Sequence, residues 1–146
     1  MKTYRKILLA VDFADHLKVV VDRAQSLAEL YQAELTVLHV VEYIPLSEPV
    51  YGSVLPLDID LTEQLAQAAR KRLHTITKRL NLPDTALRVE IGSPKSEIIR
   101  VAEESKADLI VLGSHGRHGI ALLLGSTATS VLHHAPCDVL AVRLKT

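Results

Sequence analysis

The chain has 146 residues, the size of one domain with a single hydrophobic core. Its 17 Lys and Arg balance its 17 Asp and Glu, so no net positive field would attract nucleic acid or an anionic membrane. The single Cys137 excludes an intramolecular disulfide, and no apolar run reaches the length of a signal-peptide core or a membrane span, so we expect one soluble cytoplasmic domain over residues 1–146.

The first third of the chain alternates apolar runs with a helical pattern. Residues 7–11 form a short apolar run typical of a buried parallel strand. Apolar residues at steps of three and four predict a helix over residues 17–31. Residues 35–41 are rich in β-branched side chains and predict a second strand.

The middle of the chain opens with prolines and continues with a second helix. Residues 42–58 are predicted to be the one long loop. Asp60 and Glu63 have the spacing of a capping box. The predicted apolar stripe of the helix that follows consists of Leu61, Leu65, Ala69, Leu73, Ile76 and Leu80.

A third strand and helix come next. Residues 86–91 alternate in polarity, as in a half-covered edge strand. Pro94 is expected at the first position of the helix. Its predicted inner face consists of Ile98, Ile99, Val101 and Ala102.

The C-terminal third repeats the same order of elements. Residues 108–112 predict a buried strand, and a helix is expected to open near Ser126 and to stop before Pro136. The expected inner positions of that helix are Ala128, Val131, Leu132 and Ala135. Residues 138–142 predict a last strand. Strict alternation of strands and helices predicts a three-layer α/β fold with a parallel sheet between two layers of helices.

Glycines join the fourth strand to its helix. They lie at Gly113 and Gly116 and again at Gly125, ahead of the hydroxyl groups of Ser126 and Thr127. Glycine lets backbone amides approach an anion closely, and the start of a helix attracts phosphate. Nucleotide binding is therefore the first functional hypothesis.

This segment resembles a known motif residue by residue. Residues 108–117 (DLIVLGSHGR) and 123–126 (LLGS) are similar to the strand-G-x-x-G, about nine residues, G-[ST] pattern of nucleotide-binding universal stress proteins. Residues 134–143 (HAPCDVLAVR) resemble the usual close of that family. The resemblance extends over nearly the whole chain. It implies a doubly wound, five-stranded parallel sheet in the order 3-2-1-4-5, Rossmann-like and similar to the adenine nucleotide alpha hydrolases.

The resemblance also implies a ligand, an adenine nucleotide with ATP favoured, at the point where the winding reverses. Ala10 and Val11 would line the adenine and Val40 would close over it, although each also suits plain core packing. Asp12 would bind a ribose hydroxyl or a phosphate-bound Mg²⁺, or would instead only cap the following helix. The residues expected at the phosphates are Gly113, Ser114, His115, Gly116, Arg117, Gly125, Ser126 and Thr127, with solvent exposure as the alternative for His115 and Arg117.

Other chemistry has little support in the sequence. A metal site at His115, His118, His133 and His134 lacks a nearby Cys pair or carboxylate cluster. No catalytic residue is predicted, because Ser114 has no evident base and no hydrolase or kinase signature is present. The resemblance implies at most slow ATP hydrolysis or self-phosphorylation.

The leading interpretation is a homodimeric stress-response or signalling domain in which the nucleotide acts as a switch. The dimer is expected to form through residues 138–143, because a strand at the end of the sheet leaves backbone groups unpaired. The alternative is a dimeric interaction module that binds no nucleotide, since eight residues separate Gly116 from Gly125 and the family has about nine. A slow ATP hydrolase is the third interpretation.

Overall fold

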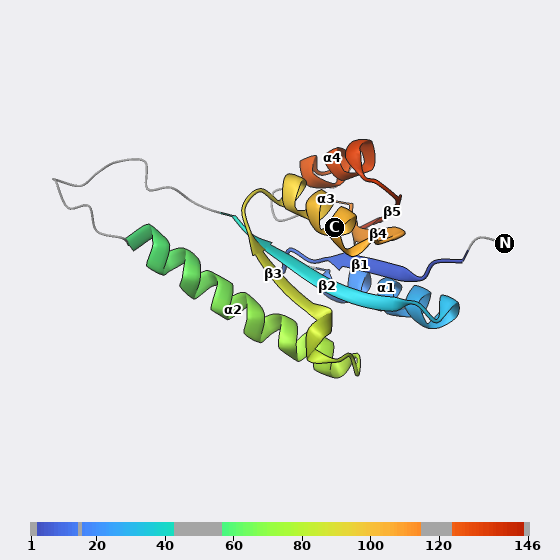
Figure 1. Cartoon of the computed structure of the whole chain (residues 1–146), viewed down its shortest axis with the longest axis horizontal. Helices are drawn as coiled ribbons and strands as arrows, with labels where there is room; N and C mark the ends of the chain where they lie inside the picture. Colours follow the sequence, from blue (N-terminus) through green and yellow to red (C-terminus); the bar gives the residue numbers. More distant parts are fainter. Residues whose placement is uncertain (1–2, 15, 43–56, 115–123, 145–146) are drawn as a thin grey trace.

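A five-stranded, all-parallel sheet with helices on both faces forms the molecule (Figure 1). The computed structural model describes residues 3–14, 16–42, 57–114 and 124–144. Its elements are β1 (Lys6–Ala10), α1 (Leu17–Tyr31), β2 (Glu34–Val41), α2 (Leu57–Arg79), the 3₁₀ turn η1 (Asp84–Ala86), β3 (Leu87–Ile91), α3 (Pro94–Ser105), β4 (Leu109–Gly113), α4 (Ser126–His134) and β5 (Asp138–Val142). The strand order β3-β2-β1-β4-β5 confirms the predicted doubly wound topology.

Successive residues of the central strands point into two different cores. On β1, Ile7 and Leu9 pack on the side of α1 and α2, whereas Leu8 packs with Leu38 and Ile110 on the side of α3 and α4. Figure 1 shows the two helix pairs on opposite sides of the sheet. Burial on both faces explains why residues 7–10 of β1 and 109–112 of β4 are continuously apolar and show no alternation.

Helix α2 corrects two predictions. It begins at Leu57, so the capping box expected at Asp60 and Glu63 lies inside the helix, and that prediction is wrong. The expected apolar stripe is also wrong in its first half, where Leu61 and Leu65 are 48% and 41% exposed. Over residues 61–79 of α2, the buried residues are Thr62, Ala66, Ala69, Leu73, Ile76 and Thr77.

The geometry of the helix explains this error. Leu73 and Ile76 set the direction that faces the sheet, and steps of three and four back from Leu73 lead to Ala69, Ala66 and Thr62. Small side chains at Ala66 and Ala69 let α2 pack closely against β2 and β3. On α4 the same correction applies to Leu132, which is 44% exposed while Ala128 and Val131 are buried.

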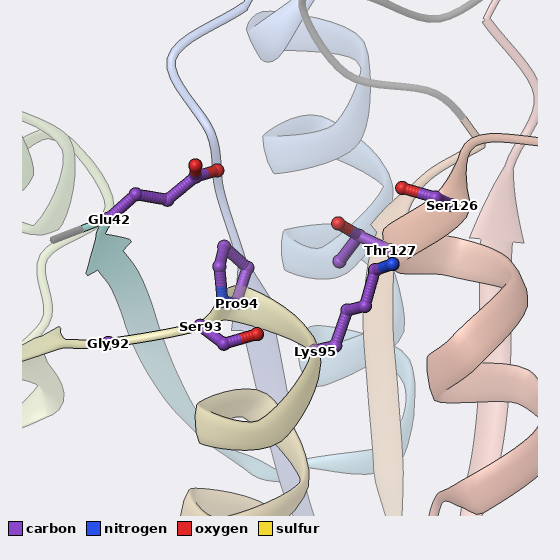
Figure 2. A pocket seen from close by; sticks show the side chains of 7 residues that line it. All are labelled: Glu42, Gly92, Ser93, Pro94, Lys95, Ser126 and Thr127. Carbon is purple, nitrogen blue, oxygen red and sulfur yellow. The ribbon is translucent and has the colours of Figure 1, made fainter. Parts of the chain in front are cut away.

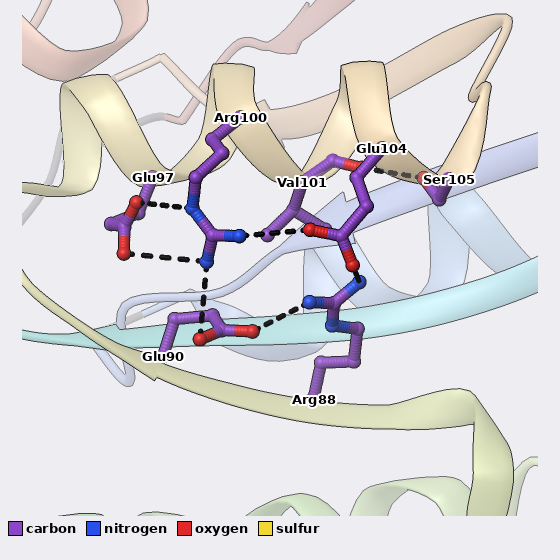
Figure 3. A network of polar contacts seen from close by, with 7 residues as sticks. All are labelled: Arg88, Glu90, Glu97, Arg100, Val101, Glu104 and Ser105. Carbon is purple, nitrogen blue, oxygen red and sulfur yellow. Dashed lines mark hydrogen bonds and ion pairs between the residues drawn. The ribbon is translucent and has the colours of Figure 1, made fainter.

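A network of charged side chains ties α3 to the edge strand β3 (Figure 3). The Arg100 guanidinium contacts Glu97 at 2.7 Å, Glu104 at 2.8 Å and Glu90 at 3.2 Å. Arg88 contacts Glu90 at 2.6 Å and Glu104 at 3.3 Å. The hydrogen bond to Glu97, together with the nearby carboxylates, raises the pKa of Arg100. Because the charges alternate around a closed network, they stabilise more than isolated surface pairs do.

We predict that Arg100→Met lowers the melting temperature by a few degrees, because it leaves three carboxylates without their shared cation. The deficit should shrink in about 1 M NaCl, where surface charges are screened. Thermal melts at low and high salt measure this effect. Lys78→Met is the matched control, because the exposed Lys78 makes no ion pair within the described ranges. A deficit that persists at high salt would mean that packing, and not charge, is what Arg100 contributes.

Candidate functional site

The carboxyl ends of β1 and β4 lie side by side at the point where the winding of the sheet reverses. β1 pairs with β2 on one side and with β4 on the other. The chain leaves β1 toward α1 on one face and leaves β4 toward α4 on the opposite face (Figure 1). The diverging connections leave room at this edge, which is where ligands bind in sheets of this kind.

Asp12 stands in a tight turn directly after β1. Its Oδ1 accepts a hydrogen bond from the Ala14 N–H at 3.0 Å, across Phe13, whose φ is 57°. The N-cap of α1 is His16, so the alternative in which Asp12 caps that helix is wrong. The exposed Asp12 Oδ2 takes no hydrogen bond within the described part of the chain and is available to a ligand.

The three residues expected around an adenine do not share one face of the sheet. Ala10 and the 7% exposed Val40 belong to the core on the side of α3 and α4. Val11 is buried in the opposite core, beneath α1 and α2. Strand alternation produces this separation, so the side chain of Val11 serves core packing, and of the three only Ala10 and Val40 share a face of the sheet.

Ser114 joins three elements at the other side of the crevice. Its N–H donates to the Val142 carbonyl at 2.8 Å, and its Oγ accepts from the Leu144 N–H at 3.1 Å. Its own carbonyl accepts from the Gly125 N–H at 2.7 Å. Ser114, which directly follows Gly113 at the end of β4, therefore has structural bonds to β5 and to the N-cap of α4.

The Gly125 amide is therefore already bonded and is not available to an anion. The N–H groups of Ser126 and Thr127, in the first turn of α4, have no carbonyl partner inside the helix and are the amides that an anion could reach. The predicted phosphate residues His115, Gly116 and Arg117 lie outside the described residues.

A depression of about 470 Å³ opens between the starts of α3 and α4 (Figure 2). Figure 2 shows Lys95 extending from α3 toward Thr127, with Glu42 entering from the end of β2. Among the described residues, its lining consists of Glu42, Gly92, Ser93, Pro94, Lys95, Ser126 and Thr127.

Sequence reasoning identified only two of these lining residues, Ser126 and Thr127. The signal for the others was present in the turn over residues 92–94, which was predicted to follow a strand. In a parallel sheet, a turn after one strand shares its edge with the turns after all the others. The cation of Lys95 and the two helix starts favour an anion beside Thr127, whereas the carboxylate of Glu42 favours a hydroxyl or amino group.

Other site chemistry is limited in the part of the chain that the structure covers. No three His, Cys, Asp or Glu side chains come together there as metal ligands, and His118, like His115, falls outside that part. His134 uses its Nδ1 in a contact with the Ser130 carbonyl at 2.9 Å. None of the described helices is long and apolar enough to cross a membrane.

Comparison with known proteins identifies the family. The model of the universal stress protein family matches residues 3–143. The chain belongs to this family. Universal stress protein A homolog 2 of Coxiella burnetii is 40% identical over 146 residues, which covers 99% of each chain.

Solved structures agree with this assignment. Universal stress protein UspA from Lactobacillus plantarum has a TM-score of 0.81 at 29% identity and covers 98% of this chain and 100% of its own. A universal stress protein solved in complex with cAMP has a TM-score of 0.65 at 26% identity, with coverage of 97% and 98%.

The turn that forms one wall of the depression depends on Gly92. Its φ is +150°, and a Cβ added there would lie 3.1 Å from Cγ of Glu97, whose carboxylate is held by Arg100. We predict that Gly92→Ala destabilises the fold by about 1–3 kcal/mol, the typical cost of a strained backbone position.

Urea unfolding measures the free energy of unfolding of Gly92→Ala and of the unmodified protein. Ser93→Ala is the control, because the exposed Ser93 makes no capping hydrogen bond and its loss should change stability by less than about 0.5 kcal/mol. Equal stability of Gly92→Ala and the unmodified protein would show that the turn tolerates a side chain.

Proposed function

We propose that this universal stress protein binds an adenine nucleotide, with ATP favoured, at the carboxyl edge of the sheet between β1 and β4. The observation that carries the proposal is that two complementary features lie at the carboxyl edge of the sheet, beside the winding reversal. A carboxylate with an available oxygen, Asp12, lies on one side, and the amides and hydroxyls of Ser126 and Thr127 lie on the other. The cAMP complex of a structural relative supports an adenine nucleotide as the class of ligand.

Each part of the nucleotide has a partner of suitable chemistry. Ala10 and Val40 offer an apolar surface to the adenine. The first turn of α4 offers hydrogen-bond donors to phosphate oxygens, and Lys95 is near enough to Thr127 to add a cation. Gly113, Gly116 and Gly125 would let the chain approach the phosphates, with His115 and Arg117 completing that part of the site.

Mg²⁺ is the metal that suits this arrangement. It prefers oxygen ligands and is usually held by one or two carboxylates together with phosphates, and Asp12 Oδ2 is such an oxygen. The alternative partner of Asp12 is a ribose hydroxyl. When bound, the metal would neutralise phosphate charge, and Asp12 would fix its position.

The nucleotide acts as a switch in this proposal, and its turnover is not required. A ligand shifts a conformational equilibrium only by its difference in affinity for the two states. We place that difference in the loop predicted over residues 42–58, of which residues 43–56 lie outside the described residues and residues 57–58 belong to α2. No described side chain is assigned to hydrolysis.

We predict that the protein binds MgATP and that Asp12→Asn weakens binding about tenfold, the effect of losing one charge-assisted contact. Asparagine keeps an oxygen that can accept from Ala14 N–H, so the melting temperature without ligand should not change. Calorimetric titration with ATP, once with Mg²⁺ and once with EDTA, separates the two roles of Asp12. If Asp12→Asn lowers the affinity for ATP only in the titration with Mg²⁺, Asp12 binds the metal. If it lowers the affinity in both titrations, Asp12 binds the ribose. Absence of MgATP binding by the unmodified protein would refute the proposal.

We also propose a homodimer through residues 138–143. β5 ends the sheet, and the bond from Ser114 N–H to the Val142 carbonyl fixes which backbone groups of β5 face β4. Because alternate residues face the same neighbour, the N–H groups of Val139 and Ala141 point away from β4 and are left to a partner.

Ala141→Pro should therefore shift the dimer toward monomer while it leaves the β4–β5 hydrogen bonds intact. Sedimentation at micromolar concentration measures the shift. Ile91→Pro is the matched control, because the pairing of Gly92 N–H with the Val41 carbonyl turns the Ile91 N–H outward on the opposite edge strand. A monomeric unmodified protein, or an unchanged dimer in Ala141→Pro, would contradict this interface.

A further inference from the structure

Phe13 adopts a backbone conformation that its side chain does not favour. Its φ of 57° lies in the left-handed region, which bulky residues other than glycine rarely enter. Such a conformation persists only where surrounding contacts hold it. Phe13 directly follows Asp12, so the contacts that hold it also bear on the proposed ligand site.

Besides its apolar packing against Val41, Ala66 and Ala69, the Phe13 ring contacts two polar side chains from different elements. The centroid of the His39 ring, from β2, lies 4.3 Å from the Phe13 centroid with the planes tilted by 34°. The guanidinium carbon of Arg72, from α2, lies 4.1 Å from the same centroid, at cation–π distance. We call Phe13, His39 and Arg72 the Phe13 clamp.

His39 also holds the residue on the other side of Asp12. Its Nδ1 lies 2.7 Å from the Val11 carbonyl oxygen, and because a carbonyl only accepts, that nitrogen bears the proton. The Asp12 carboxylate then bonds across Phe13 to the Ala14 N–H. The backbone is therefore held on both sides of Asp12, at Val11 by His39 and at Phe13 by the contacts of its ring.

We propose that Arg72 is a positioning residue for Asp12. Through the Phe13 clamp, α2 sets the turn that presents the Asp12 carboxylate to Mg²⁺ or ribose. The turn itself follows from the contacts above, while the identity of the ligand rests on the proposed function. Because coupling is reciprocal, a ligand at Asp12 also stabilises the packing of α2 against the clamp.

The contact with Arg72 is the part of the clamp that can be removed cleanly. His39 and Phe13 are partly buried, whereas Arg72 is exposed, and its loss leaves the cores in place. Arg72→Leu removes the cation and keeps an apolar side chain. Arg72→Lys retains the charge, and Arg70→Leu is the control on an exposed neighbouring position of the same helix.

The first measurement needs no nucleotide. Solvent exchange of the Ala14 amide, followed by NMR, reports the bond to Asp12 Oδ1. We expect exchange about fivefold faster in Arg72→Leu, the size of one partly exposed cation–π contact, near the unmodified rate in Arg72→Lys and unchanged in Arg70→Leu. Unchanged exchange in Arg72→Leu would overturn the proposal.

The second measurement asks whether Arg72 acts through Asp12. Arg72→Leu should weaken MgATP binding about fivefold. In an Asp12→Ala background, which removes both carboxylate oxygens, it should have no further effect, because a residue that acts only through the Asp12 side chain has nothing left to position. Additive losses would overturn the positioning role. If the unmodified protein binds no MgATP, the proposed function fails, and Ala14 exchange alone still decides whether the clamp sets the turn.

Discussion

The reversal of winding beside β1 is the constraint on which the rest of the molecule depends. β1 is the first strand in the chain and the middle strand of the sheet, with β2 on one side and β4 on the other. After each of the first four strands, the chain runs to a helix that covers one face of the sheet. The connections after β1 and β4 must therefore diverge, and the residues that follow the two strands lie at one edge of the sheet. Asp12, Ser114 and the start of α4 all lie at this edge because of topology, although more than 100 residues separate the first from the last along the chain.

Three kinds of interaction hold the residues at this edge of the sheet in place. Aromatic and cation–π contacts hold Phe13 and, with it, the turn of Asp12. Backbone hydrogen bonds at Ser114 tie the end of β4 to β5 and to α4. The charge network around Arg100 anchors α3, whose first residues form the wall opposite Thr127. Apolar burial stabilises the sheet, and directional contacts set the positions of the site residues, so substitutions can separate stability from binding.

Strong local patterns were enough to predict the order of the strands and helices. They also predicted most of the boundaries of these elements to within one residue. α1 and β5 have the predicted bounds, and Pro94 begins α3 as expected. The prediction failed at Leu61, Leu65 and Leu132, because hydrophobicity does not reveal which of two adjacent rows of a helix faces the sheet.

The site was predictable only where a single segment supplies the chemistry. The Gly125–Thr127 segment was proposed from a local motif, and Asp12 from the family resemblance; their roles stay predictions. Lys95 and Glu42 were missed because they come together only through packing of α3 beside β2. The side chains of Ala10 and Val11 face opposite cores, which strand alternation implies and the grouping of the two residues ignored. Phe13 was overlooked because its positive φ and its contacts with His39 and Arg72 depend on tertiary structure that no local pattern reveals.

The two edges of the sheet are protected in different ways. On β3, Arg88 and Glu90 place charges of both signs along the edge and engage them in the network with α3, a common defence against strand pairing. On β5, residues 139–142 are all apolar. An edge that is apolar over these four residues suits a partner strand, which a second copy of the chain supplies in the proposed homodimer. Ser114 bonds to Val142 and Leu144 at that edge and to Gly125 at the site. A partner strand that straightens or shifts β5 would therefore act on the start of α4 through Ser114, and a ligand at α4 would act on the dimer through the same bonds.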